Sequence, residues 1–230
     1  MSPTFAGVEL PPAAPTVLTD AAIVIFLHGR ALGPDTVHQV APAYPGARLV
    51  APAGGVLLKR GSTWFENERI GVAKRDSVAA AETRFLAWLD GYVEAGCRPW
   101  LCGFSNGGAF AGHLLMHHPA RFAGAALLSA PLVLPPWKPN VLRGKPVFYG
   151  RGRTDPVVPN DMFAAAEAYL NRASGAVLTR CHYDIAHEID PAEVRDVAGW
   201  FARCTGTQSS SAPRPPGAEG SHLSNEQQAS

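Results

Sequence analysis

Short apolar runs alternate with amphipathic segments along most of the chain. The apolar runs have the length of buried strands, and they lie at residues 22–27, 47–51, 100–104, 124–129, 146–149 and 177–183. Segments with helical spacing of apolar residues lie at 76–96, 107–118, 161–173 and 191–203. This alternation is typical of an α/β protein whose mainly parallel sheet is covered by helices on both faces.

Changes in composition along the chain indicate the domain boundaries. With 230 residues, 47% of them hydrophobic, the chain can bury one sizeable core, which we place at residues 21–204. Residues 1–20 are rich in proline but include apolar side chains, so we expect an extended segment along the domain edge. Residues 205–230 are rich in Ser, Pro, Gly and Gln, and we expect them to form a disordered tail.

The charge of the chain and its lack of targeting signals limit the classes of partner and the location that we expect. The formal net charge is +1 and no basic run occurs, so a small-molecule partner is expected, and neither nucleic acid nor an anionic membrane. The chain begins without a secretory signal and has no apolar stretch of about 18 residues, which predicts no membrane span and a cytoplasmic location.

The four cysteines lack C-x-x-C spacing and are expected to be reduced and structural. Monomer and homodimer both remain open.

The apolar run at 100–104 ends abruptly in a G-x-S-x-G motif, Gly103 to Gly107, and passes directly into a predicted helix. This layout predicts a nucleophile elbow, in which Ser105 occupies a sharp strand-to-helix turn. The serine oxygen then lies at a helix N-terminus, where backbone N–H groups favour negative charge. The alternative interpretation is an ordinary tight turn.

A serine nucleophile needs a histidine base and a carboxylate that orients the histidine. Asp155 follows a predicted strand within a glycine-containing loop, and His187 follows the next strand, so the chain order is Ser, Asp, His, as in α/β-hydrolases. Asp184 and Asp190 flank His187 and are alternative acids. Asp155 is favoured because the orienting carboxylate of that fold comes from a separate loop.

Four segments together resemble the phospholipase/carboxylesterase group of α/β-hydrolases, which includes the acyl-protein thioesterases. They are Phe26–Arg30, Gly103–Gly108, Asp155–Pro159 and His187–Ile189, which are similar to the group's L-H-G-x, G-F-S-x-G-G, D-x-x-V-P and G-H-x-I motifs. The likeness covers roughly residues 20–203. It implies an α/β-hydrolase fold.

The resemblance also implies roles for individual residues. Ser105 is expected to be the nucleophile, His187 the general base and then acid, and Asp155 the orienting carboxylate. The backbone N–H groups of Arg30 and Asn106 are expected to form the oxyanion hole. No cofactor or metal is implied.

Two further residues concern the surroundings of this site. His28, beside the predicted oxyanion loop, is expected to fix that loop through hydrogen bonds without titrating in the mechanism. His182 lies within a predicted strand and is expected to be structural.

Substrate-binding residues are predicted from their position near this edge of the sheet. Trp64 and Phe65 follow the second strand, as a similar aromatic pair does in the group, and either line the substrate pocket or belong to the core. Leu132 lies in the proline-rich segment 130–139, and Val157 lies in the Asp155 loop. That segment is too short for a large lid, which favours an open site for small to medium acyl esters.

The helix after the elbow carries His113, His117 and His118. A zinc site of the H-E-x-x-H type needs a glutamate directly after the first histidine, where Leu114 stands instead. A solvated or core-edge histidine face is therefore expected, and no metal site.

The sequence thus predicts a serine carboxylesterase. The alternatives are a thioesterase for acyl-protein or acyl-carrier substrates, and a non-catalytic ligand-binding member of the same fold.

Overall fold

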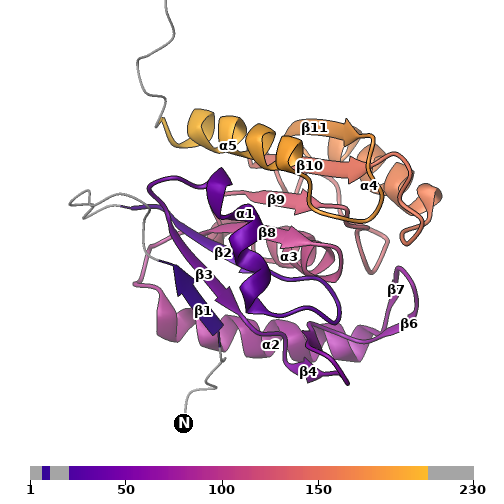
Figure 1. Ribbon diagram of the computed structural model, residues 1–230, viewed down its shortest axis with the longest axis horizontal. Helices are drawn as coiled ribbons and strands as arrows, with labels where there is room; N and C mark the ends of the chain where they lie inside the picture. Colours follow the sequence, from indigo (N-terminus) through magenta and orange to yellow (C-terminus); the bar gives the residue numbers. More distant parts are fainter. Residues whose placement is uncertain (1–6, 11–20, 207–230) are drawn as a thin grey trace, which may run out of the picture.

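A seven-stranded sheet forms the centre of the computed structural model, which describes residues 7–10 and 21–206 (Figure 1). From one edge to the other its strands are β1 (Gly7–Leu10), β3 (Arg48–Pro52), β2 (Ile23–Leu27), β8 (Trp100–Phe104), β9 (Ala125–Leu128), β10 (Pro146–Gly152) and β11 (Val177–Tyr183). All neighbouring strands are parallel except β1, which runs antiparallel to β3. The carboxyl ends of the parallel strands therefore meet at one edge.

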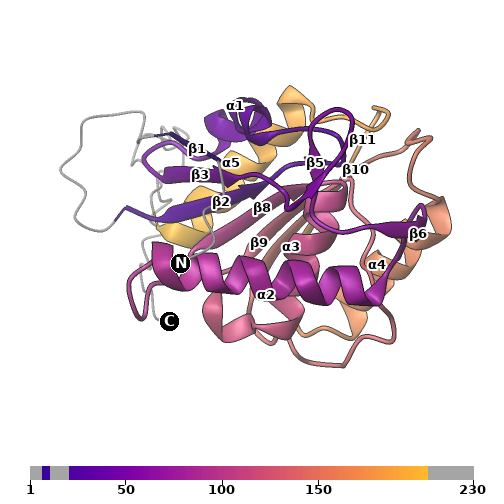
Figure 2. The ribbon, with the colours of Figure 1, turned by 90° about the horizontal axis from the view of Figure 1, so that it is seen from below.

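Helices cover both faces of this sheet. Figure 2 shows α2 (Arg75–Tyr92), α3 (Asn106–His117) and α4 (Asn160–Arg172) on one face, and α1 (Val37–Val40) and α5 (Pro191–Thr205) on the other. Short 3₁₀ turns are present at η1 (Pro34–Thr36), η2 (Ala41–Ala43) and η3 (Pro119–Arg121). The predicted α/β class and doubly covered parallel sheet are thus confirmed.

The two faces carry separate hydrophobic clusters, as alternation along the strands requires. Leu101 of β8 packs in the cluster with Phe85 of α2 and Phe110 of α3. The next residue, Cys102, packs in the opposite cluster with Val194 of α5. Every residue of β8 is buried because both of its faces are covered, which explains the continuous apolar run from which this strand was predicted.

All predicted strands and helices are present; β8 and β11 have the predicted ends, and the others are shifted. The helix expected at 76–96 ends at Tyr92, because Val93 is extended and Gly96 then turns the chain with a φ of 88°. The strand expected at 146–149 continues to Gly152, because the residues from Gly150 to Gly152 pair in parallel with β11. Helix α5 continues to Thr205 and is followed by Gly206 in the left-handed conformation.

Two small hairpins between β3 and α2 were not predicted. They pair β4 (Val56–Leu57) with β5 (Ser62–Thr63), and β6 (Asn67–Arg69) with β7 (Val72–Ala73). These strands are too short to show an apolar alternation, so the sequence pattern could not reveal them.

The ends of the chain are described only in part. Within the predicted N-terminal segment, Gly7–Leu10 forms the edge strand β1. The predicted tail lies outside the described residues from position 207 onward, as do positions 1–6 and 11–20. Among the helices of the described part, none is both long and apolar enough to span a membrane.

Candidate active site

Ser105 occupies the turn between β8 and α3, at the carboxyl edge of the sheet. Its φ is 54° and its ψ is −118°, a conformation that non-glycine residues rarely adopt. The backbone N–H of Ser105 donates to the carbonyl of Leu128 at the end of β9, 2.9 Å away. The turn is thus held by the sheet in a strained form, which is characteristic of a nucleophile elbow.

Gly103 and Gly107 permit the tight approach of strand and helix at this turn. A Cβ on Gly103 would lie 2.5 Å from the carbonyl oxygen of Gly107. A Cβ on Gly107 would lie 2.0 Å from the carbonyl oxygen of Leu27 in β2. Any side chain at either position would therefore force the elbow open.

His187 and Asp155 meet Ser105 from two other loops. Nε2 of His187 lies 2.8 Å from Oγ of Ser105, and Nδ1 of His187 lies 2.6 Å from Oδ2 of Asp155. Asp155 follows β10 and His187 follows β11, so adjacent parallel strands deliver both side chains to the same edge of the sheet. The ring of Phe104 lies beside the imidazole, with centroids 5.0 Å apart.

Asp155 is fixed by its own loop. Its Oδ1 accepts hydrogen bonds from the backbone N–H groups of Val157 (2.8 Å) and Val158 (3.0 Å), which leaves Oδ2 for the histidine. Its side chain is fully buried. The carboxylate thus has two roles at once, shaping the loop and contacting His187.

The other two acids near His187 have different partners. Asp184 is 91% exposed at its side chain and pairs with Arg153. Asp190 accepts a hydrogen bond from the N–H of Ala192 and caps the start of α5. The structure thus brings Asp155, and neither of these, into contact with the imidazole.

Arg30 and Asn106 both line the cavity in front of Ser105. Asn106 is the first residue of α3, so its N–H is among those without an acceptor inside the helix. Its side-chain Oδ1 accepts from the Thr63 hydroxyl (2.7 Å) and the Trp64 N–H (3.0 Å), which fixes the residue. Beside Arg30, Ala31 has a φ of 62° and its N–H donates to the carbonyl of Ser62, which ties this loop to β5.

His28 lies behind the Arg30 loop, fully buried. Its Nδ1 lies 2.8 Å from the carbonyl oxygen of Gly29, and its Nε2 accepts from the N–H of Gly54 at 3.0 Å. Burial lowers the pKa of His28, although the bond to Gly29 opposes the shift. The ring is therefore a neutral structural link between two loops, and its side chain is outside the cavity.

The cavity in front of Ser105 has a volume of about 280 Å³ and mostly apolar walls. Of the four predicted substrate-binding residues, Phe65 and Val157 line it and Trp64 and Leu132 do not. The other apolar residues that line it are Ile70, Ala109, Pro131, Val133 and Val158. No sequence signal marked Ile70, since it lies at the tip of the unpredicted β6–β7 hairpin.

Trp64 belongs to the core. Its ring stacks on Phe110 with centroids 5.4 Å apart, and its indole N–H donates to the carbonyl of His28. Leu132 lines an adjoining cavity of about 340 Å³, which shares Gly71 with the first. For Trp64 the structure therefore agrees with the core interpretation, and it places Leu132 beyond the immediate surroundings of Ser105.

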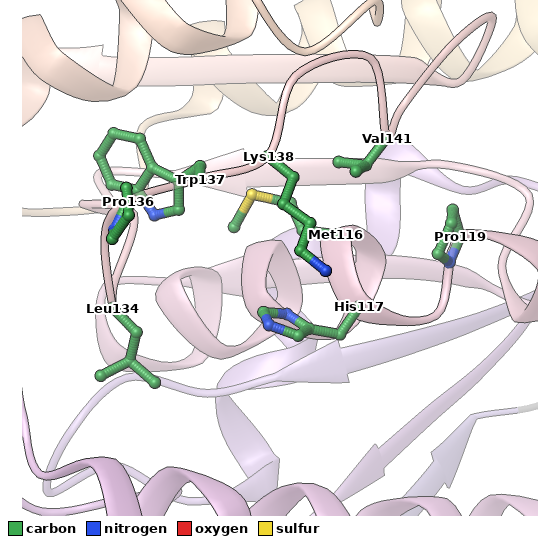
Figure 3. Close-up of a pocket in the computed structure, with 8 residues that line it drawn as sticks. All are labelled: Met116, His117, Pro119, Leu134, Pro136, Trp137, Lys138 and Val141. Atoms are coloured by element: carbon green, nitrogen blue, oxygen red, sulfur yellow. The ribbon is translucent and has the colours of Figure 1, made fainter.

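A third cavity, of about 370 Å³, lies at the far end of α3. Figure 3 shows that Trp137 and Lys138 of the β9–β10 connection border it above Met116 and His117 of the helix. Neither Ser105 nor His187 borders this cavity, so it is separate from the candidate active site.

Histidines in α3 and directly after it contact α2. The two carboxylate oxygens of Glu82 lie 2.6 Å from Nε2 of His113 and 2.6 Å from Nε2 of His118. Within the residues that the structure describes, no group of His, Cys, Asp and Glu has the arrangement of a metal site. In a similar way, His182 contacts Glu167, which also pairs with Arg151.

A mainly parallel sheet with an elbow serine, followed by an acid and a histidine after later strands, defines the α/β-hydrolase class. Within that class, residues 15–205 match the phospholipase/carboxylesterase family, to which the chain therefore belongs.

Individual relatives agree with this membership. The chain is 26% identical over 202 residues to a probable carboxylesterase of Oryza sativa subsp. japonica, covering 77% of this chain and 86% of the relative. It is 26% identical over 188 residues to the putative hydrolase MhqD of Bacillus subtilis, covering 80% and 94%. The fold is similar to that of the Bacillus cereus carboxylesterase, with a TM-score of 0.73, 20% identity and coverage of 86% and 93%. The protein is a carboxylesterase-type hydrolase.

Proposed function

We propose that the protein hydrolyses carboxylic esters of small to medium acyl groups through an acyl-enzyme formed on Ser105. The observation that carries this proposal is the chain of contacts from Oγ of Ser105 to Nε2 of His187 (2.8 Å) and from Nδ1 of His187 to Oδ2 of Asp155 (2.6 Å). A hydroxyl that contacts an imidazole held by a buried carboxylate has the base that it needs to become a nucleophile.

In the first step, Oγ of Ser105 attacks the ester carbonyl while Nε2 of His187 takes the hydroxyl proton. The imidazolium that forms is stabilised by the carboxylate of Asp155, to which Nδ1 donates. Because Oδ1 of Asp155 is already bound by two backbone N–H groups, Oδ2 keeps a fixed position toward the ring.

The tetrahedral intermediate carries a negative oxygen, and in this proposal the N–H groups of Arg30 and Asn106 stabilise it. Both residues line the cavity with Ser105, and Asn106 adds the N-terminus of α3. His187 then protonates the departing alcohol, and the ester bond breaks to leave the acyl group on Ser105.

A water molecule completes the cycle. His187 takes a proton from that water, whose oxygen attacks the acyl-enzyme, and the same histidine returns the proton to Oγ of Ser105 as the acid leaves.

The cavity supports the substrate class. Its volume of about 280 Å³ and its apolar walls suit an uncharged acyl chain of modest length. Two of its lining residues, Ile70 and Val157, are 56% and 41% exposed, so the cavity reaches the surface of the protein.

Partitioning of a common intermediate tests the proposal. Phenyl butyrate and p-nitrophenyl butyrate are each hydrolysed in the presence of methanol, and the ratio of methyl butyrate to butyric acid is measured. Both esters should give one ratio, because both pass through the same butyryl-enzyme. The Ser105→Ala variant should form neither product above background. A ratio that changes with the leaving group would contradict the acyl-enzyme.

A further inference from the structure

Glu193 is a fully buried acid that the proposed mechanism does not use. It lies in the first turn of α5, with 0% of its surface exposed. Neither of its carboxyl oxygens has a partner with hydrogen-bond geometry in the described structure. A carboxylate rarely occupies such a position, because loss of water strongly disfavours the charged form.

The position of Glu193 links it to His187 along the chain. Helix α5 begins at Pro191, capped by Asp190, only four residues after the histidine. Glu193 is three residues beyond Asp190, the place of the second member of a capping box. The His187 loop therefore leads directly into the helical turn that carries Glu193.

Strand β10 packs against α5, and two of its glycines allow Glu193 and the His187 loop to approach the strand closely. A Cβ on Gly150 would lie 2.2 Å from Oε1 of Glu193. Two residues further along the same face, a Cβ on Gly152 would lie 2.3 Å from the carbonyl oxygens of Ile185 and Ala186, directly before His187. One face of β10 thus contacts Glu193 and the backbone that carries the histidine.

The same strand leads to the acid of the site. Three residues after Gly152, the chain reaches Asp155, whose Oδ2 contacts His187. The strand on which Glu193 packs at Gly150 is thus the strand that leads to Asp155.

Within the described part of the chain, the titratable groups that interact with Glu193 carry no positive charge. They are the cap residue Asp190, Asp196 of α5, Tyr44 after η2, Cys102 of β8 and Cys181 of β11. Burial raises the pKa of Glu193 to about 8, and the Asp190 and Asp196 carboxylates act in the same direction, while the nearby backbone N–H of Asp190, which lies outside hydrogen-bond geometry, opposes them. The side chain is thus an uncharged acid at neutral pH.

We propose that Glu193 is a positioning residue for His187 that works as the neutral acid, and that its ionisation in alkaline solution separates the start of α5 from β10 and withdraws His187 from Asp155 and Ser105. This inference rests on the proposed function for its effect on turnover. Its structural part, a buried neutral acid between helix and strand, is independent of any reaction.

The Glu193→Gln variant tests the effect on turnover. Glutamine keeps the size of the protonated acid and has no proton to lose. In wild type, kcat/KM should fall about thirtyfold between pH 7 and pH 9.5, as one ionisation near pH 8 requires. In Glu193→Gln, activity at pH 7 should be close to that of wild type and this alkaline fall should be absent.

Glu188→Gln is the matched control. Glu188 is exposed and adjacent to His187, so this variant removes a carboxyl group close to the histidine while leaving the α5–β10 contact intact. It should keep the alkaline fall of wild type. A Glu193→Gln variant with an unchanged alkaline fall, or one that is folded and inactive at pH 7, would overturn the proposal.

A measurement without substrate separates this inference from the proposed function. The carboxyl ¹³C signal of Glu193, assigned by its loss in Glu193→Gln, should titrate near pH 8 in the full chain. Since the folded value lies above the ordinary value of 4.5, the unfolding free energy of wild type should decrease relative to Glu193→Gln as pH rises from about 4.5 to about 8, and the difference should then level off. Titration near 4.5 would overturn the inference, whether or not the protein hydrolyses esters.

Discussion

Oδ2 of Asp155 lies 2.6 Å from Nδ1 of His187, although the two residues are 32 positions apart in the chain. The contact depends on two loops that follow neighbouring strands, β10 and β11. It orients the imidazole so that Nε2 faces Ser105. Ring orientation and tautomer are thus both controlled by one carboxylate oxygen.

Replacement of Asp155 by asparagine should lower kcat by about 10³-fold to 10⁴-fold. An amide at this position presents a donor to Nδ1 and favours the imidazole tautomer whose Nε2 carries the proton and cannot accept one from Ser105. Steady-state kinetics with p-nitrophenyl butyrate measures the effect. Asp184→Asn, in which an exposed acid beside the same histidine loop is changed, should retain near-wild-type kcat. Comparable losses in both variants would argue against the assignment of Asp155.

Replacement of Gly107 by alanine should destabilise the fold by more than about 3 kcal/mol, because the new Cβ would lie 2.0 Å from the carbonyl oxygen of Leu27. Urea unfolding measures the change. Gly91→Ala is the control, since a Cβ on this glycine of α2 would meet no neighbouring side chain or loop within 4 Å. Alanine there should stabilise the helix by about 0.5–1 kcal/mol. Equal stability of the two variants would contradict the tight packing at the elbow.

Ile70 should influence the preference for acyl length. Ile70→Ser removes an exposed apolar side chain from the lining of the cavity and should lower kcat/KM for hexanoate esters relative to acetate esters by about threefold to tenfold. Leu57→Ser changes another exposed apolar residue, on the β4–β5 hairpin, that does not line the cavity, and should leave this ratio unaltered. A similar shift in both variants would remove the assigned role of Ile70.

His28 should make a pH-dependent contribution to stability. Burial lowers its pKa below the ordinary value of 6.5, so the unfolded chain takes up a proton before the folded chain does. The stabilisation by His28 is therefore complete above pH 6.5 and decreases as pH falls below it. At pH 7.5 the free energy of unfolding of His28→Asn should be about 1–3 kcal/mol lower than that of wild type, and this difference should be smaller at pH 5. A difference that is constant between these pH values would contradict this account.

The sequence was sufficient to predict the sheet and the main helices because each has a continuous apolar pattern. Strand β8 and helix α3 are the clearest cases, since the buried run and the G-x-S-x-G motif adjoin without a gap. The ends were less predictable. The extension of β10 to Gly152 depends on pairing with β11, a contact between distant parts of the chain that no local pattern encodes.

The candidate site divides in the same way. Ser105, Asp155 and His187 could be predicted from motif and chain order, and the structure brings them into contact. Ile70 could not, because it reaches the cavity from a two-strand hairpin with no sequence signature. The burial of Glu193 could not be predicted either, since a glutamate in the first turn of an amphipathic helix is usually exposed to solvent.

Covalent labelling tests the central claim most directly. The protein is exposed to a fluorophosphonate, and the intact mass and the labelled peptide are measured for wild type, Ser105→Ala and His187→Ala. We predict one phosphonyl adduct on Ser105 in wild type, none in Ser105→Ala, and labelling slowed by at least about 10²-fold in His187→Ala, because the serine needs its base. Absence of an adduct on correctly folded wild type would contradict an activated serine and would favour a non-catalytic ligand-binding protein.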